Sequence, residues 1–204
     1  MRAEVTTVEE LRDIVGHPSD GVANKVGSRL ATIHRDWLAQ SPLAFVATVD
    51  ADGRLDVSPK GDPPGFVHII DEVTIAIPER PGNKRVDGYL NVLQRPHVGT
   101  LFVVPGRGDT LRVNGRATVL SDADYFDAME VKGKRPILAL EIAVDEVFFH
   151  CPKAFLRSDT WKPESWNPTA LPSVAQMVHS VDSQPSLAEW EQELSDEKMR
   201  TQLY

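Results

Sequence analysis

Cysteine is almost absent from this sequence, since Cys151 is the only one among 204 residues. A single cysteine excludes a disulfide within the chain and a metal site built from several thiolates. It fits a reducing compartment, so we expect a cytoplasmic protein. The sequence also lacks any run of roughly 18 apolar residues, the length that a membrane-spanning helix needs. Its N-terminal residues show no apolar stretch typical of a secretory signal peptide.

An excess of positive charge is lacking too. The 22 Lys and Arg residues are outnumbered by 30 Asp and Glu, and the net charge is −8. Broad binding to nucleic acid or to an anionic membrane surface requires a basic face. We therefore expect neither nucleic acid nor a membrane as a partner.

The common catalytic and metal-binding motifs are missing as well. The six histidines do not show the spacing of metal ligands, and neither G-x-S-x-G nor G-x-x-x-x-G-K-[ST] occurs. Gly106-Arg-Gly-Asp109 contains a G-x-G, but a strand pattern rather than a helix follows it, which argues against a Rossmann fingerprint. The sequence thus predicts no metal site and identifies no catalytic side chain.

The hydrophobic residues that are present, 41% of the chain, suffice for a packed core, and their spacing changes from helical to strand-like near residue 43. Thr7 and Glu10 match a capping box, which predicts a first helix, and a second is expected over 24–40. Later helices are expected over 84–95, over 124–129 and from residue 186 onward, with a loop over 159–186. Strand patterns occur at 43–50, 54–58, 66–70, 73–77, twice within 98–120, and at 137–149.

Strands joined mostly by tight turns favour a mainly β fold with flanking helices over a βαβ repeat. We predict an antiparallel β-barrel, closed or half-closed, of six or more strands with N- and C-terminal helices. The expected organisation is a helical extension over 1–40, the barrel domain over 41–158, and a loop and helix over 159–204. The last segment is expected to pack on the barrel or on a partner subunit.

A cationic turn, Arg80-Pro-Gly-Asn-Lys-Arg85, precedes the helix expected over 84–95. Asn83 is a candidate N-cap, and free backbone N–H groups at a helix start bind phosphate. Lys84 and Arg85 would add full charges, and Arg can hold phosphate through two hydrogen bonds. The alternative is a solvated basic loop whose cations pair with the neighbouring Glu79 and Asp87.

A second candidate feature is Ser58-Pro59-Lys60, at the end of a predicted strand. Pro59 cannot donate a ladder hydrogen bond, so it belongs at a sheet edge or a bulge. An open edge there would present backbone groups to a planar ligand, with Lys60 as a nearby cation. An ordinary strand end is the alternative. On a later strand, Thr110 shares a face with two other polar residues, which suits either solvent or a polar ligand.

Taken together, residues 30–150 resemble the pyridoxamine 5′-phosphate oxidase-like family of flavin mononucleotide (FMN)-binding split barrels. The match is closer to a bacterial flavin-nucleotide-binding subgroup, through three ordered blocks. They are Pro-Gly-Asn-x-Arg-x-Asp at 81–87, Val-Pro-Gly with Thr-Leu-Arg-Val-Asn-Gly-Arg-Ala at 104–117, and His-Cys-x-Lys-Ala with Arg-Ser and Trp at 150–161.

The resemblance implies a homodimer with FMN at the subunit interface. It implies that Ser58, Pro59 and Lys60 lie along the flavin ring, and that Thr110 takes the place of a glutamine near it. The phosphate would be held by the cationic turn, through Arg80, Asn83, Lys84 and Arg85. Arg157 and Trp161 would complete the site from the other subunit.

Two departures from the family pattern bear on the substrate. The cationic turn lies about one helical turn further from Pro96 than in the oxidase, and the chain ends Thr-Gln-Leu-Tyr204 instead of carrying the oxidase's Arg-Leu-x-Pro ending. Pyridoxamine phosphate is therefore not the expected substrate. We expect an FMN-dependent oxidoreductase acting on another small molecule, with cations of the site stabilising the reduced flavin. The alternative is a non-enzymatic carrier or binder of flavin, of the deazaflavin F420 or of haem.

Overall fold

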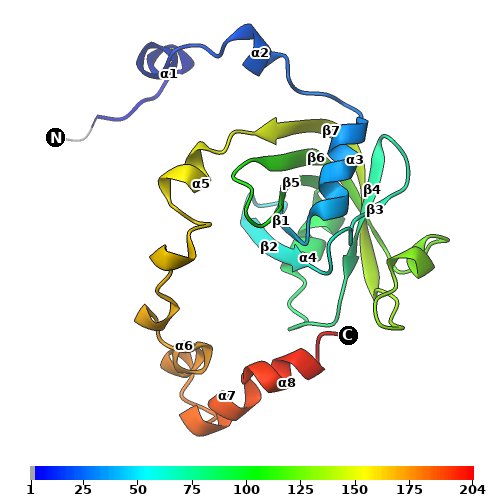
Figure 1. Cartoon of the computed structure of the whole chain (residues 1–204), viewed down its shortest axis with the longest axis vertical. Helices are drawn as coiled ribbons and strands as arrows, with labels where there is room; N and C mark the ends of the chain where they lie inside the picture. Colours follow the sequence, from blue (N-terminus) through cyan, green and yellow to red (C-terminus); the bar gives the residue numbers. More distant parts are fainter. Residues whose placement is uncertain (1–2) are drawn as a thin grey trace.

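Seven strands form one antiparallel sheet in the computed structural model, which describes residues 3–204. In chain order they are β1 (Leu43–Val49), β2 (Leu55–Gly61), β3 (His68–Ile69), β4 (Thr74–Glu79), β5 (His97–Val103), β6 (Thr110–Leu120) and β7 (Leu138–His150). The order across the sheet is β2-β1-β5-β6-β7-β4-β3 (Figure 1). Because β2 and β3 do not pair with each other, the curled sheet is a split barrel rather than a closed one.

The strand β1 shows why the sheet has one buried face. Ala44, Val46 and Thr48 are buried, whereas Phe45 between them is exposed. This alternation follows from the period of two in a strand and directs every second side chain into the core. The opposite face of β1 and β2 therefore carries apolar side chains in contact with solvent, including Leu55 and Val57.

A β-bulge bends the two longest strands where they pair. The register of β6 against β7 shifts between Asn114 and Gly115. A Cβ atom at Gly115 would lie 2.0 Å from the carbonyl oxygen of Ala143 on β7, so only glycine fits there. Bulges increase local strand bending and twist, which allows the sheet to curl around its core.

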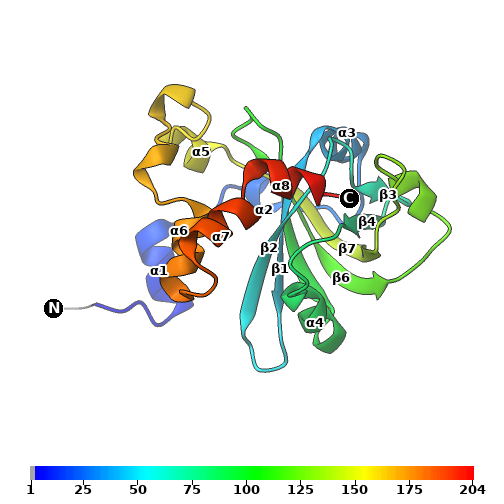
Figure 2. The same ribbon diagram turned by 90° about the horizontal axis from the view of Figure 1, so that it is seen from below.

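The core fills the curled sheet and is closed at its ends by two helices. In Figure 2, α3 (Thr32–Gln40) and α4 (Asp87–Gln94) lie at opposite ends of the barrel. Trp37 from α3 and Tyr89 from α4 are both buried. The largest fully buried apolar side chains are Phe102, Phe126, Leu38, Ile75, Ile77, Leu111, Ile142, Val113 and Val147.

The remaining helices lie outside the barrel, in two arms on the same side of it (Figure 1). The N-terminal arm holds α1 (Val8–Val15) and α2 (Asp20–Ala23); the C-terminal arm holds α5 (Lys153–Arg157), α6 (Val174–Val181), α7 (Leu187–Glu193) and α8 (Asp196–Thr201). Short 3-10 turns occur at Phe126–Met129, Pro163–Ser165 and Pro168–Ala170. No helix within residues 3–204 is long and apolar enough to cross a membrane.

The predicted mainly β, antiparallel split barrel with flanking helices is confirmed, and so is the capping box at Thr7. The helix expected from residue 186 begins with a capping box at Ser186. Several helix bounds were wrong. The helix expected over 24–40 begins only at Thr32, because residue 27 forms a β-bridge to β7. The segment 124–129 is a single 3-10 turn, and the expected loop over 159–186 contains α6, whose own capping box starts at Ser173. The division into three segments stays a prediction.

Candidate functional site

A cavity of about 620 Å³ opens beside the free edge of β2, within the size range of small-molecule sites. We call it the β2 pocket. Its walls come mainly from β2, from the end of β4 with the loop 80–86 that follows it, and from the first turn of α4. The residues that line it are Asp56, Val57, Ser58, Pro59, Lys60, Glu79, Arg80, Pro81, Gly82, Asn83, Lys84, Arg85, Val86, Asp87, Gly88, Tyr89 and Ile137.

Seven of the ten predicted site residues share this pocket, namely Ser58, Pro59, Lys60, Arg80, Asn83, Lys84 and Arg85. The structure brings together two features, a strand edge and a cationic loop, that lie about twenty residues apart in the sequence. Pro59 pairs with Phe45 of β1 on one side, and β2 is an edge strand on the other, as the proline predicted.

The other three predicted residues do not line the β2 pocket. Thr110 is buried at the start of β6. Trp161 donates a 2.7 Å hydrogen bond from its indole to the carbonyl of Arg107 in the β5–β6 turn, and it stacks on Phe155. Arg157 is exposed at the end of α5. Their predicted part in the site stays a prediction.

Lys60 is held inside the pocket by an acidic partner that the sequence did not single out as a site residue. Its ammonium lies 2.5 Å from a Glu79 carboxylate oxygen, and the Tyr89 hydroxyl donates to the same oxygen at 2.8 Å. The ammonium also lies over the Tyr89 ring, 4.9 Å from its centroid. Burial, and then the Glu79 charge, raise the pKa of Tyr89, so its phenol stays a donor. This cluster joins β2, β4 and α4 and carries no net charge.

The Arg80 side chain is likewise held by hydrogen bonds within the protein. Its Nε donates to Asp62 at 2.6 Å, and its two terminal nitrogens donate to the carbonyls of Met129 and Lys134 at 2.6 and 3.3 Å. The side chains of this ion pair are only 11% and 2% exposed. Arg80 therefore acts as a wall of the pocket, with few donors left for a ligand.

The loop itself departs from the expected helix start. The helix begins at Asp87 rather than near residue 84, and Val86 stands at the N-cap with a left-handed φ of 49°. Asn83 is not the N-cap; its side-chain oxygen accepts from the backbone N–H of Arg85 and closes a local turn. Lys84 is also left-handed, with φ 64°. Two residues of this loop, Lys84 and Val86, thus adopt the left-handed backbone conformation, which is uncommon for residues other than glycine.

The loop leaves two cations in the open part of the pocket. Arg85 pairs with Asp87 at 2.7 Å, but the side chains are 75% and 40% exposed. Such an exposed pair contributes at most about 1 kcal/mol, so an anionic ligand can replace the carboxylate. Lys84 is exposed and forms no ion pair among residues 3–204. The alternative, that cations of the basic loop pair with Glu79 and Asp87, holds only for Arg85 with Asp87, because Glu79 pairs with Lys60 of β2. Lys84 therefore keeps its charge free for a ligand.

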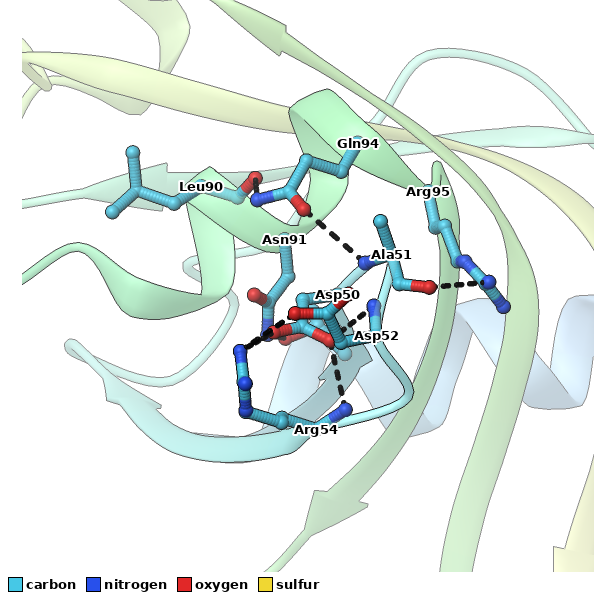
Figure 3. A network of polar contacts seen from close by, with 9 residues as sticks. Asp50, Ala51, Asp52, Arg54, Leu90, Asn91, Gln94 and Arg95 are labelled. Carbon is cyan, nitrogen blue, oxygen red and sulfur yellow. Dashed lines mark hydrogen bonds and ion pairs between the residues drawn. The ribbon is translucent and has the colours of Figure 1, made fainter.

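A hydrogen-bond network ties α4 to β1 and to the β1–β2 turn (Figure 3). Gln94 accepts from the backbone N–H of Ala51 at 3.2 Å, and Arg95 donates to the carbonyl of the same residue at 2.6 Å. One turn earlier, Asn91 donates to the buried Thr48 hydroxyl at 3.0 Å. Because the β1–β2 turn is bonded to the end of α4, the edge of β2 and the first turn of α4 keep fixed positions on the two sides of the pocket.

A family model places these residues among known proteins. The model described as pyridoxamine 5′-phosphate oxidase matches residues 31–151, which is more than half of the chain and includes every wall of the β2 pocket. The chain belongs to the pyridoxamine 5′-phosphate oxidase family. The family resemblance drawn from the sequence blocks is thereby confirmed. No protein of curated function matches the chain.

Solved structures similar to this family member include HupZ from Group A Streptococcus, 24% identical, with a TM-score of 0.47 over 59% of this chain and 93% of that chain. HutZ, the heme storage protein of Vibrio cholerae, is 17% identical, with a TM-score of 0.41 over 60% and 94%. General Stress Protein 26 from Bacillus anthracis is 14% identical, with a TM-score of 0.37 over 56% and 92%.

Sequence reasoning missed three acidic or phenolic residues that shape the pocket: Asp62, Glu79 as the partner of Lys60, and Tyr89. Glu79 directly precedes the cationic turn, so it counted only as a possible neutralising neighbour. Tyr89 has a helical spacing that is equally typical of core residues. Only the pairing of β4 with β7 and the docking of α4 bring them against Lys60.

Proposed function

We propose that this chain binds FMN in the β2 pocket and acts as an FMN-dependent oxidoreductase on a small molecule, as a homodimer. The observation that carries the proposal is the pocket itself. It joins an open strand edge to two exposed cations, and it lies wholly within the segment that the family model matches.

The phosphate end of FMN is assigned to the loop 80–86. Lys84 and Arg85 are exposed there, and a phosphate dianion outcompetes the single carboxylate of Asp87 for the guanidinium because it offers more charge and more acceptor oxygens. Lys60 and Arg80 are held by the carboxylates of Glu79 and Asp62, which are 17% and 2% exposed, so they shape the site and contribute less charge to the ligand.

The isoalloxazine ring is assigned to the edge of β2, along Ser58, Pro59 and Lys60. An edge strand offers backbone polar groups to a flat ligand, and Pro59 removes one donor that the ring would otherwise have to satisfy. Bound FMN would supply the redox chemistry, while the protein orients it and sets its electrostatic surroundings. No nucleophilic side chain is required, in keeping with the lack of such motifs in the sequence.

A flavin suits the pocket better than haem does. No His, Cys or Met is among the lining residues, and the phenol of Tyr89 is engaged with Glu79. A haem iron would therefore find no free axial ligand on the described walls. A flavin needs none.

The homodimer is supported by the outer face of β1 and β2. Phe45, Leu55 and Val57 are exposed there side by side on neighbouring strands, with exposed fractions of 37%, 80% and 61%. An apolar patch of this kind favours contact with another protein surface. In such a dimer we propose that the partner subunit's Arg157 and the partner subunit's Trp161 reach the β2 pocket.

Titration of the apo protein with FMN, followed by flavin fluorescence, tests the assignment. Arg85→Ala combined with Asn83→Ala should weaken FMN binding several-fold or more. The control is Arg54→Ala, which removes an equally exposed arginine in the β1–β2 turn and should leave binding unchanged. Wild-type affinity in the double variant would remove the loop from the site. Saturable binding of haem or reduced F420 without FMN binding would overturn the cofactor.

Two further measurements separate the finer parts of the proposal. Anaerobic reduction of the bound flavin by NADH or NADPH, followed by reoxidation with an acceptor, supports an oxidoreductase. Stable binding with no reduction by any donor indicates a carrier instead. A solution mass equal to one chain at micromolar concentration would contradict the interfacial site.

A further inference from the structure

Tyr204 contacts the barrel beside Arg80, one of the residues that line the β2 pocket. Its hydroxyl donates to Oδ1 of Asp62 at 2.5 Å, while Oδ2 of the same carboxylate accepts from Arg80. The Tyr204 ring lies 5.7 Å from the guanidinium carbon of Arg80 and 5.0 Å from the ammonium of Lys132. Three cationic or anionic groups of the barrel thus form a socket for one phenol.

This contact ties the tail segment, which we define as residues 187–204 with helices α7 and α8, to the barrel. Neither helix has a buried residue. Across the part of the chain that the structure describes, the Tyr204 hydroxyl makes the one hydrogen bond between the tail segment and the barrel. The other side-chain hydrogen bonds of α8 stay within the tail, such as those from Ser195 and Thr201.

Asp62 connects the socket to the pocket wall. Its side chain is 2% exposed and its two oxygens have different partners, one in the wall and one in the tail. A buried carboxylate that loses one donor must recruit water or shift toward its remaining partner. The position of Arg80, which lines the pocket, therefore depends on whether Tyr204 is seated.

We propose that Tyr204 is a latch, which holds the tail segment beside the β2 pocket and positions Arg80 through Asp62. The part that concerns the ligand rests on the proposed function. Since coupling between two sites is reciprocal, a ligand that favours the seated Arg80 also favours the closed latch. The latch predicts that FMN binding protects the tail segment, although no residue of the tail lines the pocket.

Limited trypsin digestion, read by mass spectrometry, measures latch opening, because cleavage at Lys198 and Arg200 requires α8 to unfold, and a seated Tyr204 anchors the chain just after that helix. When opening is fast, the cleavage rate follows the open population. Tyr204→Phe removes a hydrogen bond to a charged group and should raise the rate at these two sites by about tenfold. Tyr125→Phe is the matched control, because that phenol also donates to a carboxylate, at 2.8 Å, but far from the tail in sequence.

The expected result is faster cleavage of α8 in Tyr204→Phe without FMN, unchanged cleavage in the control, slower cleavage of the wild type with saturating FMN, and weaker FMN binding by the variant. Equal rates for wild type and Tyr204→Phe in the absence of FMN would overturn the latch. A faster rate with unaltered FMN affinity would overturn the coupling to the pocket. If the wild type fails to bind FMN, the proposed function falls, while the digestion without FMN still decides the latch.

Discussion

Replacing Arg80 should unfold the protein at a much lower temperature, whereas replacing its neighbour in the same loop, Arg85, should not. Arg80→Ala leaves the carboxylate of Asp62, 2% exposed, without its cation and removes donors from two carbonyls. Breaking a buried ion pair by removing one partner costs about 3–5 kcal/mol. For a domain of this size that corresponds to a fall in Tm of roughly 6–20 °C.

Arg85→Ala is the internal control, because it removes the same side chain from an ion pair whose members are 75% and 40% exposed. The expected change is within about 1 kcal/mol. Thermal melting by circular dichroism, repeated by urea denaturation, compares the two variants with the wild type. If the Tm of Arg80→Ala lies within about two degrees of the Tm of Arg85→Ala, the Arg80 guanidinium does not stabilise the fold. The division of the site into structural and ligand-binding cations would then be wrong.

Three further predictions concern the barrel and its helices. Gly115→Ala should destabilise the protein by about 3 kcal/mol through overpacking at the bulge, and Gly99→Ala, whose added Cβ would meet its nearest atom at 3.4 Å, should cost far less in the same urea assay. Tyr89→Phe should cost about 1.5–3 kcal/mol, because Glu79 loses a donor, and an unchanged urea midpoint would contradict that bond. Burial lowers the pKa of both His34 and His68 from 6.5, so the unfolded chain binds more protons than the folded chain as the pH falls below 6.5. The contribution of these two histidines to stability is therefore complete above about pH 6.5 and is lost as the pH falls through their lowered pKa values. Melting in buffers on both sides of this range checks the sign, since a Tm that rises on acidification would refute it.

The sequence by itself determined the fold class and the place of the pocket. Alternation along β1 and the proline in β2 are local signals, because a strand period of two and a missing N–H act on the residues that carry them. The order of the blocks over 30–150 was enough to indicate the family that the family model confirms. The same local signals misjudged where α4 begins, since Asn83 satisfies its side chain within the loop and the helix starts three residues after Lys84.

Only the tertiary structure decided which charges are free to meet a ligand. In the sequence, Lys60, Arg80, Lys84 and Arg85 are four equivalent cations. Folding pairs the first two, mostly shielded from solvent, with carboxylates from other strands or loops and leaves the last two exposed. Burial and ion pairing depend on which strands become neighbours in the fold. Local sequence patterns do not predict contacts between residues that lie far apart in the chain. Lys60 and Glu79 are nineteen positions apart, and Tyr204 and Asp62 are 142 positions apart.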